Sequence, residues 1–501
     1  MRVARALVAT LGEALWWRAW FLAIPLSFEL CFLELPANAP RFVCRVLTKG
    51  LVRFFGMILS RFFQFVSVVV VAALFLVPRG SAAAAAAAAG AKGPPNIVMI
   101  ISDDQAWQDY SFMGHPNIQT PNLDRLAAES RLFARGYVPA SLCCPSLASM
   151  ITGRYPHQHR VTSNDPPLPA GMKPGEFNKS QAFKDGREVM NKFMEATPTL
   201  PRMLTKAGYL TLQTGKWWQG HFSNGGFTHG MTRGGRHGDD GLDIGRKTMV
   251  PIADFLDVAQ REKKPFFVWY APMMPHTPHN PPARFFDKYK NKTSSPHVAR
   301  YWAMVEWFDE TCGELLDTLE KRGVADNTIV VFLTDNGWIQ DPDAPKYAPK
   351  SKQSQYDGGV RTPILLRWPG HAKPERVPHL ASSVDFMPTL LKAAGVAAPA
   401  DLPGVDLLDD AALAKRDTLF GEIFTHNAVD LQNPASSLRW RWMIEGDWKL
   451  IVPAARNEPK AVVELYNLAL DSSEEKNLAA TEKERVERLL KKLDGWWPGK
   501  L

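Results

Sequence analysis

The run Asn96-Ile-Val-Met-Ile-Ile-Ser102, which is followed at once by the carboxylates Asp103 and Asp104, decides how the rest of the chain is interpreted. It is continuously apolar, a pattern typical of a strand that is buried on both faces of a parallel sheet. Similar runs occur at 265–270 and 328–334, and each ends in polar, Pro-rich or Gly-rich sequence. The sequence therefore predicts at least three buried strands.

Helical patterns lie between or beside these runs, at 120–135, 200–207 and 301–322. Because strand and helix alternate, an α/β layered fold is expected. In such sheets, ligands bind beyond the carboxyl ends of the strands. The polar residues that close the three runs are therefore candidate site residues.

The C-terminal part has a different pattern of predicted helices and strands. A helix is predicted at 384–395, packed back on the sheet. Beyond residue 410, two short strand-like pieces at 439–444 and 448–452 precede a charged helix at 474–493. Since 501 residues exceed the roughly 250–300 that one core usually organises, a division is expected. We predict a catalytic domain at 94–410 and a smaller subdomain at 411–501.

The N-terminal part is typical of an export leader that ends at residue 93. An apolar run at 65–77 is shorter than the ~20 residues that span a bilayer, and alanines follow it at 82–89. We expect a signal peptide at about 57–93, with residues 1–56 as an extension upstream of a natural start at Met57. Export to the periplasm or secretion follows, and an uncleaved membrane anchor is the alternative.

The net charge of +8 is concentrated in this leader. Residues 1–92 carry ten basic and three acidic side chains, so the remainder keeps only about +1. A global basic field, the usual mark of a nucleic-acid-binding protein, is therefore absent from the mature sequence. No nucleic-acid partner is expected.

The cysteines beyond the leader are Cys143, Cys144 and Cys312. An odd number in an exported protein argues against a disulfide framework and indicates a thiol that is kept for another reason. The adjacent pair Cys143 and Cys144 is the candidate.

Oxygen-bearing side chains follow two of the predicted strands. Asp103 and Asp104 close the first, and Asp335 and Asn336 close a later one. A single acidic pair at a strand end is often only a helix cap or a turn. Two such sets, each directly after a buried strand, favour a hard cation, and calcium accepts the larger and less regular shell. We predict Ca²⁺, in preference to Mg²⁺, at these four residues.

The segment Cys143–Arg154 carries a specific pattern. Its sequence resembles the sulfatase signature Cys-x-Pro-Ser-Arg-x-x-x-Leu-Thr-Gly-Arg, in which the first cysteine is converted to formylglycine. The resemblance implies that Cys143 is modified by a formylglycine-generating enzyme, is a metal ligand and acts as the nucleophile. The alternative is a buried, inert cysteine.

The resemblance to sulfatases continues through much of the chain. It extends to Gly215-Lys216-Trp217, Pro275-His276-Thr277-Pro278, Lys352 before the 357–361 segment, and a C-terminal box at 464–479. It implies that Lys216 and Lys352 hold the sulfate and that His276 lies beside the leaving-group oxygen. It also implies an alkaline-phosphatase-like layered fold, with a largely parallel central sheet and a smaller C-terminal α+β subdomain.

Two positions depart from the family pattern. Leu147 stands where the signature has arginine, and Trp218 stands where the family's Gly-Lys-Trp-His box has histidine. His221, His229 or His237 could substitute for that missing histidine, and spacing alone does not choose among them.

Three functions are compatible with these residues. The first is calcium-dependent hydrolysis of a sulfate ester on a sulfated carbohydrate or an aryl or alkyl sulfate, so that the partner is a sulfated small molecule or glycan. The second is hydrolysis of a phosphoester or phosphonate ester. The third, suggested by Leu147 and Trp218, is binding of sulfated glycan without turnover.

Overall fold

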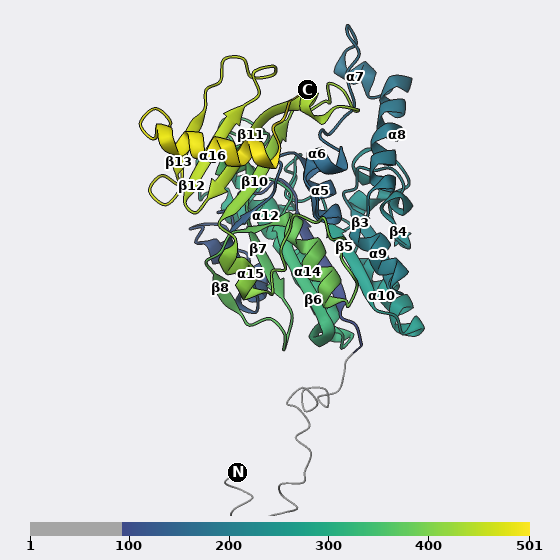
Figure 1. The fold of residues 1–501 in the computed structure, drawn as a ribbon. Coiled ribbons are helices and arrows are strands. Elements are labelled where there is room, and N and C mark those ends of the chain that lie inside the picture. Colours follow the sequence, from purple (N-terminus) through teal and green to yellow (C-terminus); the bar gives the residue numbers. More distant parts are fainter. Residues whose placement is uncertain (1–92, 501) are drawn as a thin grey trace, which may run out of the picture. The chain divides into compact units, whose positions relative to one another are not determined.

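The computed structural model describes residues 93–500 (Figure 1). The predicted leader lies outside this range, apart from Gly93. Among the described residues, nine strands form one sheet in the order β4-β3-β5-β1-β6-β7-β2-β8, with β9 paired to β2. Their bounds are β1 Asn96–Ser102, β2 Arg131–Tyr137, β3 Leu210–Gly215, β4 His229–Gly230, β5 Phe266–Ala271, β6 Thr328–Thr334, β7 Arg361–Arg367, β8 Glu375–Val377 and β9 Ala381–Ser382.

Strand β1 lies at the centre of the sheet, parallel to β5 on one side and to β6 on the other. All of its residues are buried. Ile97 and Met99 enter one hydrophobic core, whereas Val98 and Ile100 enter a second core on the opposite face. This explains why the strand is apolar without alternation, and it confirms the prediction of a largely parallel sheet.

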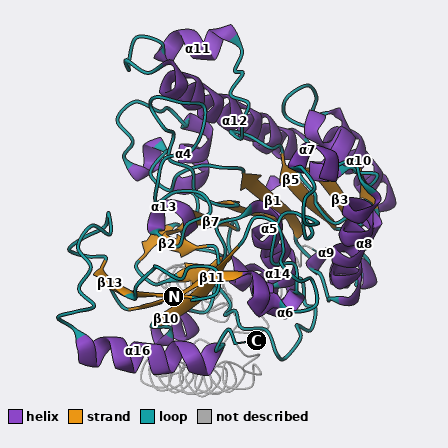
Figure 2. Cartoon of the chain, turned by 90° about the horizontal axis from the view of Figure 1, so that it is seen from above, coloured by secondary structure: helices purple, strands orange, loops and turns teal. Residues whose placement is uncertain are grey.

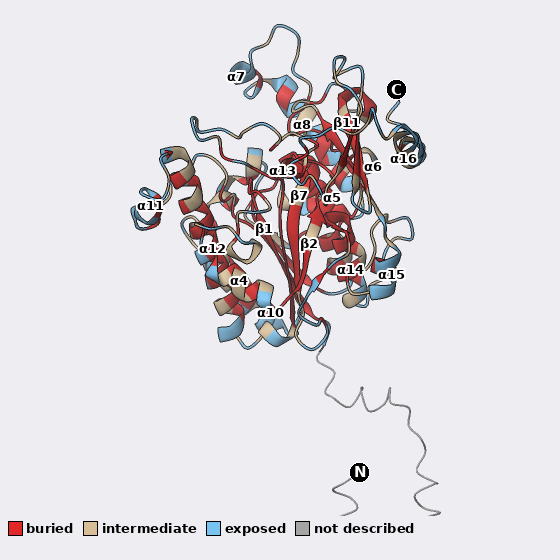
Figure 3. Cartoon of the chain, turned by 90° about the vertical axis from the view of Figure 1, so that its left-hand side faces the viewer, coloured by how far each residue is buried: buried red, intermediate tan, exposed pale blue. Residues whose placement is uncertain are grey.

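Helices cover both faces of this sheet (Figure 2). The buried strands lie between the two helical layers (Figure 3). One core includes residues of α5 Cys143–Thr152, α8 Gln181–Ala196, α9 Leu200–Lys206 and α14 Phe386–Ala393. The other includes residues of α4 Pro121–Ala128, α10 Val250–Glu262 and α12 Pro296–Lys321. Shorter helices are α6 Pro156–His159, α7 Pro174–Phe177, α11 Ala283–Tyr289, α13 Asp357–Val360 and α15 Asp410–Lys415. Within residues 93–500, none of the helices has the length and apolar character needed to cross a membrane.

The predicted helix at 120–135 is wrong in its second half. Helix α4 ends at Ala128, and Arg131–Tyr137 forms β2, which pairs with β7. A Cβ atom on Gly136 would lie 2.4 Å from the carbonyl oxygen of Thr362. Pairing with a strand more than 200 residues away thus overrides the local helical pattern, and only glycine permits this close approach.

The C-terminal part forms a second, antiparallel sheet in the order β10-β11-β12-β13, with bounds Thr418–Phe424, Leu438–Glu445, Trp448–Pro453 and Glu464–Asn467. Helix α16, Lys483–Trp496, covers one face, where Leu489 and Leu493 pack on Met443 and Leu450. The α+β character of this part is confirmed. The predicted start of the terminal helix at residue 474 is wrong, and the boundary at 410/411 stays a prediction.

A buried ionic cluster ties this second sheet to the central one. Lys449 of β12 is fully buried, and its Nζ lies 2.8 Å from Asp357 Oδ1 and 2.8 Å from Glu474 Oε1. Asp357 opens helix α13 and leads into β7. Glu474 lies outside any helix or strand, between exposed neighbours, but its own side chain is buried, and its carboxylate also accepts the backbone N–H of Asp357 at 2.6 Å.

Replacing Lys449 with methionine is expected to lower the free energy of unfolding by about 3–5 kcal/mol, because two carboxylates would stay buried without their cation. Chemical denaturation measures this loss. The exposed Lys460 is the matched control, and Lys460→Met should change stability by less than about 0.5 kcal/mol. Equal stabilities of the two variants would contradict this role for Lys449.

Candidate active site

The carboxyl ends of β1 and β6 bring the predicted metal ligands together. Ser102 pairs with Thr334, so the residues that follow each strand meet at the same edge of the sheet. The backbone N–H of Asp104 donates to Asp335 Oδ1 at 3.0 Å, and Asn336 Nδ2 donates to Asp104 Oδ1 at 2.7 Å. All of these side chains are buried.

Two oxygens in this cluster accept no hydrogen bond. Asp335 Oδ2 and Asn336 Oδ1 are buried and have no hydrogen-bond partner among the described residues. Burial and the neighbouring Asp103 raise the pKa of Asp335. A divalent cation would satisfy these oxygens and relieve the repulsion between the carboxylates, so the residues fit a calcium or magnesium ion.

Cys143 is the first residue of α5, which is buried along its whole length. Its Sγ lies within 4.8 Å of ligand atoms from Asp103, Asp104 and His276. The positive end of a helix macrodipole favours an anion at this position. Burial raises the pKa of the Cys143 thiol well above its ordinary value, which keeps the unmodified side chain neutral and weakly nucleophilic.

The neighbouring Cys144 has different surroundings. Gln219 Nε2 donates to its Sγ at 3.3 Å, and its backbone N–H donates to Asn164 Oδ1 at 2.9 Å. Burial raises the pKa of Cys144 to about 11. Of the two cysteines, Cys143 is the one whose side chain lines a cavity, together with Asp104 and His276.

Two lysines place positive charge beside the acidic cluster. Lys216 follows β3, and its Nζ lies 2.7 Å from the carboxylate of Asp103 and 3.5 Å from Asp335 Oδ2. Lys352 Nζ lies 2.6 Å from both carboxylate oxygens of Asp104. Burial acts to raise the pKa of Asp104, but Lys352 and other nearby cations outweigh it and hold this pKa well below the usual range.

His276 lies beside Asp104. Its Nδ1 is 2.7 Å from the carbonyl oxygen of Thr277, so Nδ1 carries a proton and donates it there. Its Nε2 lies 3.3 Å from Asp104 Oδ2. Burial lowers the pKa of His276, and Asp104 opposes that effect. Nε2 is therefore the atom that can exchange a proton with a ligand.

One cavity of about 300 Å³, which we call the catalytic cavity, is lined by Asp104, Cys143, His276 and Lys352. The sequence did not single out several of the side chains that line it, because they come from separate loops without a motif. These are Asn164, Arg236, Trp338, Lys346, Tyr347, Gln353 and His426. Arg236 is fixed by two hydrogen bonds to the carboxylate of Asp165, at 3.1 and 2.9 Å.

Of the three candidate histidines, His237 is the one that lines the catalytic cavity. Its ring packs edge-on against Trp218, with centroids 4.3 Å apart, and lies 6.4 Å from the ring of His276. Burial, together with Lys216, lowers the pKa of His237 to about 2, so the imidazole is neutral. By contrast, His221 Nδ1 shares a hydrogen bond with Ser223 Oγ, and His229 packs against Phe255.

The loop that carries His237 depends on glycine. Gly238 has φ +128°, and a Cβ atom there would lie 2.5 Å from the carbonyl oxygen of Gly215 at the end of β3. The loop therefore packs directly on the backbone that precedes Lys216. This close approach places His237, nineteen residues further along the chain, beside Trp218.

Leu147, the other departure, is one turn after Cys143 and is buried in the hydrophobic core. It supplies no charge to the site. The cations that act on the Cys143 side chain are Lys216 and Lys352.

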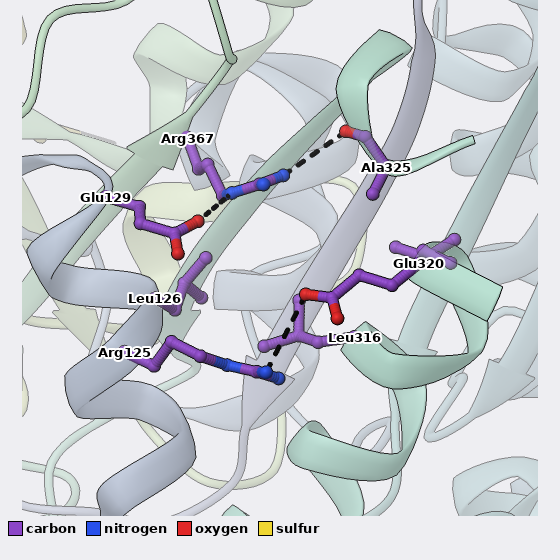
Figure 4. Close-up of a pocket in the computed structure, with 8 residues that line it drawn as sticks. Arg125, Leu126, Glu129, Leu316, Glu320, Ala325 and Arg367 are labelled. Carbon is purple, nitrogen blue, oxygen red and sulfur yellow. Dashed lines mark hydrogen bonds and ion pairs between the residues drawn. The ribbon is translucent and has the colours of Figure 1, made fainter. Parts of the chain in front are cut away.

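Another cavity, away from the catalytic cavity, has different properties. It lies between α4 and α12, measures about 10 Å³ and offers room for about one water (Figure 4). Its charged groups are already paired, since Arg367 binds Glu129 at 2.6 Å and Arg125 lies 3.7 Å from Glu320. It has none of the properties of a ligand site.

Comparisons with known proteins agree with this geometry. The family model described as Sulfatase matches residues 95–396, and the model described as N-sulphoglucosamine sulphohydrolase, C-terminal, matches residues 350–495. N-acetylgalactosamine-6-sulfatase of Homo sapiens is 30% identical over 361 residues, which cover 62% of this chain and 65% of that protein. Arylsulfatase A of Homo sapiens is 30% identical over 370 residues, covering 62% and 66%.

The matched region thus spans about two thirds of the length of these relatives. Among solved structures, Ps i-CgsB is 23% identical, with a TM-score of 0.63 over 81% of this chain and 94% of that chain. This likeness supports the alkaline-phosphatase-like fold. The sulfatase model covers well over half of the sequence, and its region contains the whole cluster around Cys143. The chain therefore belongs to the sulfatase family.

Proposed function

We propose that the protein hydrolyses a sulfate ester on a sulfated carbohydrate or a related organic sulfate, using formylglycine made from Cys143. One observation carries this proposal. Cys143 opens a buried helix and lines the same cavity as Lys352, His276 and Asp104, and Asp104 is hydrogen-bonded to an oxygen-rich cluster with unsatisfied buried oxygens. That combination suits a tetrahedral anion held beside a nucleophile.

The chemistry of the modified residue supports this choice. The hydrate of its aldehyde supplies one hydroxyl that can attack sulfur and a second whose deprotonation expels the sulfate. A cysteine thiol lacks the second hydroxyl. A formylglycine-generating enzyme is therefore a required partner of this chain.

The metal ligands in this proposal are Asp103, Asp104, Asp335 and Asn336, with the modified Cys143 side chain. A calcium ion bound there would supply positive charge to the sulfate oxygens. Lys216 and Lys352 provide two further cations, the first paired with Asp103 and the second with Asp104. Together they balance the charge that develops as the ester bond to sulfur breaks.

Two histidines move protons in this proposal. His276, through Nε2, gives a proton to the alkoxide that leaves when the ester S–O bond breaks. His237 accepts the proton from the second hydroxyl, because it lines the same cavity and packs against Trp218. It takes the place of the histidine that is absent at position 218.

His237→Ala is expected to lower kcat by about 10²- to 10⁴-fold, the scale for the loss of a general base. Because His276 stays intact, the first step should continue. Rapid-quench kinetics should therefore show one equivalent of alcohol released quickly, followed by slow turnover. His229→Ala is the matched control and should turn over like the wild type. A loss of the burst together with kcat would contradict this role for His237.

Export belongs to the same proposal, since the leader pattern precedes the catalytic domain. Mature protein recovered from the periplasm or the medium should lack residues 1–93, and N-terminal sequencing tests this. Protein that keeps residue 1 or residue 57 as its first residue would favour an anchor.

The class of ester is tested by assaying wild-type protein with an aryl sulfate and an aryl phosphate in parallel. Faster hydrolysis of the sulfate supports the proposal. Cleavage of the phosphate alone would replace it with a phosphoester hydrolase, and binding of sulfated glycan without cleavage of either would indicate an inactive relative.

A further inference from the structure

A second cavity of about 510 Å³ adjoins the catalytic cavity. Thr277 and Pro345 line both of them. The remaining lining residues of the second cavity are Pro278, His279, His297 and Arg300. A ligand whose reacting group lies at Cys143 can therefore extend past Thr277 into this second cavity, which we call the outer cavity.

The outer cavity has a free positive charge. Neighbouring bases on the same helix pair are neutralised, since Arg284 binds Glu310 and Lys288 binds Glu306. Arg300, by contrast, is exposed on α12 and forms no ion pair or hydrogen bond with any residue of the described chain. Its guanidinium carbon lies 4.8 Å from the ring centroid of Phe286. No Asp or Glu is among the described residues that line this cavity.

The other basic side chains contribute less charge. His279 is held between Tyr301 and Trp338, with ring centroids 5.4 and 5.7 Å away. Burial lowers its pKa to about 4, so it is neutral at neutral pH. His297 lies one turn before Arg300 on α12. Arg300 is thus the permanent cation of the outer cavity.

We propose that the outer cavity is a subsite for a second anionic group of the substrate, a sulfate or carboxylate on the sugar unit next to the one whose sulfate ester is cleaved. A guanidinium matches both anions because it presents paired N–H donors to two oxygens. Both cavities have volumes usual for ligand sites. The inference rests on the proposed function and narrows it to oligosaccharides that carry at least two anionic groups.

Binding tests the subsite without turnover. In protein that carries Cys143→Ala, calorimetry should compare three sulfated disaccharides, whose neighbouring unit is neutral, carboxylated or sulfated. Adding Arg300→Ala should weaken binding of the two doubly anionic disaccharides by about tenfold and leave the neutral one unchanged. Arg284→Ala, on a nearby arginine that is already paired, should change none of them.

Turnover provides the second readout. With Cys143 intact, Arg300→Ala should lower kcat/KM about tenfold for the disaccharide with a carboxylated or sulfated neighbour, mainly through KM, and leave aryl sulfate hydrolysis unchanged. Loss with only one of the two anions identifies which one the subsite takes.

Failure of the subsite inference can be distinguished from failure of the proposed function. If Arg300→Ala binds all three disaccharides as its parent does, or if the parent prefers none of them, the subsite inference is wrong even when aryl sulfate is hydrolysed. If wild-type protein hydrolyses no sulfate ester, the proposed function is wrong, and the calorimetric difference still decides whether the subsite exists.

Discussion

Cys143→Ala is expected to abolish sulfate ester hydrolysis, with a fall of about 10⁴-fold or more in kcat, the scale for removing a catalytic nucleophile. Cys144→Ala is expected to keep most of the activity. The two residues are adjacent, yet the Cys143 side chain lines the catalytic cavity whereas Cys144 Sγ accepts a hydrogen bond from Gln219. Steady-state assays of both variants with an aryl sulfate measure the difference.

Comparing the two variants controls for effects on folding, because each replaces a buried cysteine with alanine. Each truncation should cost a similar free energy of unfolding, so thermal denaturation should not separate the variants as activity does. Wild-type turnover by Cys143→Ala would rule out the proposed nucleophile.

Removal of divalent cations is expected to lower kcat by about 10³-fold, because the charge on the transferring sulfate would lose several kcal/mol of stabilisation. Calcium added back should restore the rate. Asp335→Ala should behave like the chelated wild type, since it removes Oδ2, a buried oxygen that accepts no hydrogen bond from the described residues. Asp341→Ala, at a partly exposed acid outside this cluster, is the control.

Thermal unfolding gives a readout that does not depend on activity. A ligand that binds the folded state at 100 times its Kd stabilises it by about 2.7 kcal/mol. Calcium should therefore raise the Tm of metal-free wild-type protein, and it should not raise the Tm of Asp335→Ala. Full activity in a demonstrably metal-free preparation would contradict the metal assignment.

The core of the site could be predicted because it follows from strand geometry. The continuous apolar runs identify β1 and β6, and parallel strands deliver Asp103 and Asp335 to the same edge of the sheet. Lys216 and His276 follow β3 and β5 and reach that edge for the same reason. Their roles came from family resemblance, since a lysine after a strand is by itself an ordinary surface residue.

Other features could not be predicted from local pattern. The choice of His237 over His221 and His229 depends on a glycine loop that packs on the backbone at Gly215. The strand at 131–137 forms through long-range pairing, in a stretch whose spacing is also compatible with a helix. Arg300 belongs to no sequence motif. That it lacks an ion-pair partner among the described residues, while neighbouring bases are paired, is visible only in the structure.

The mass of the peptide that carries Cys143, isolated from active protein co-expressed with a formylglycine-generating enzyme, tests the central claim most directly. We predict an aldehyde in place of the thiol at Cys143, an unmodified Cys144, and sulfate hydrolysis in proportion to the modified fraction. An unmodified thiol at Cys143 in protein with full sulfate hydrolysis would contradict the proposed chemistry.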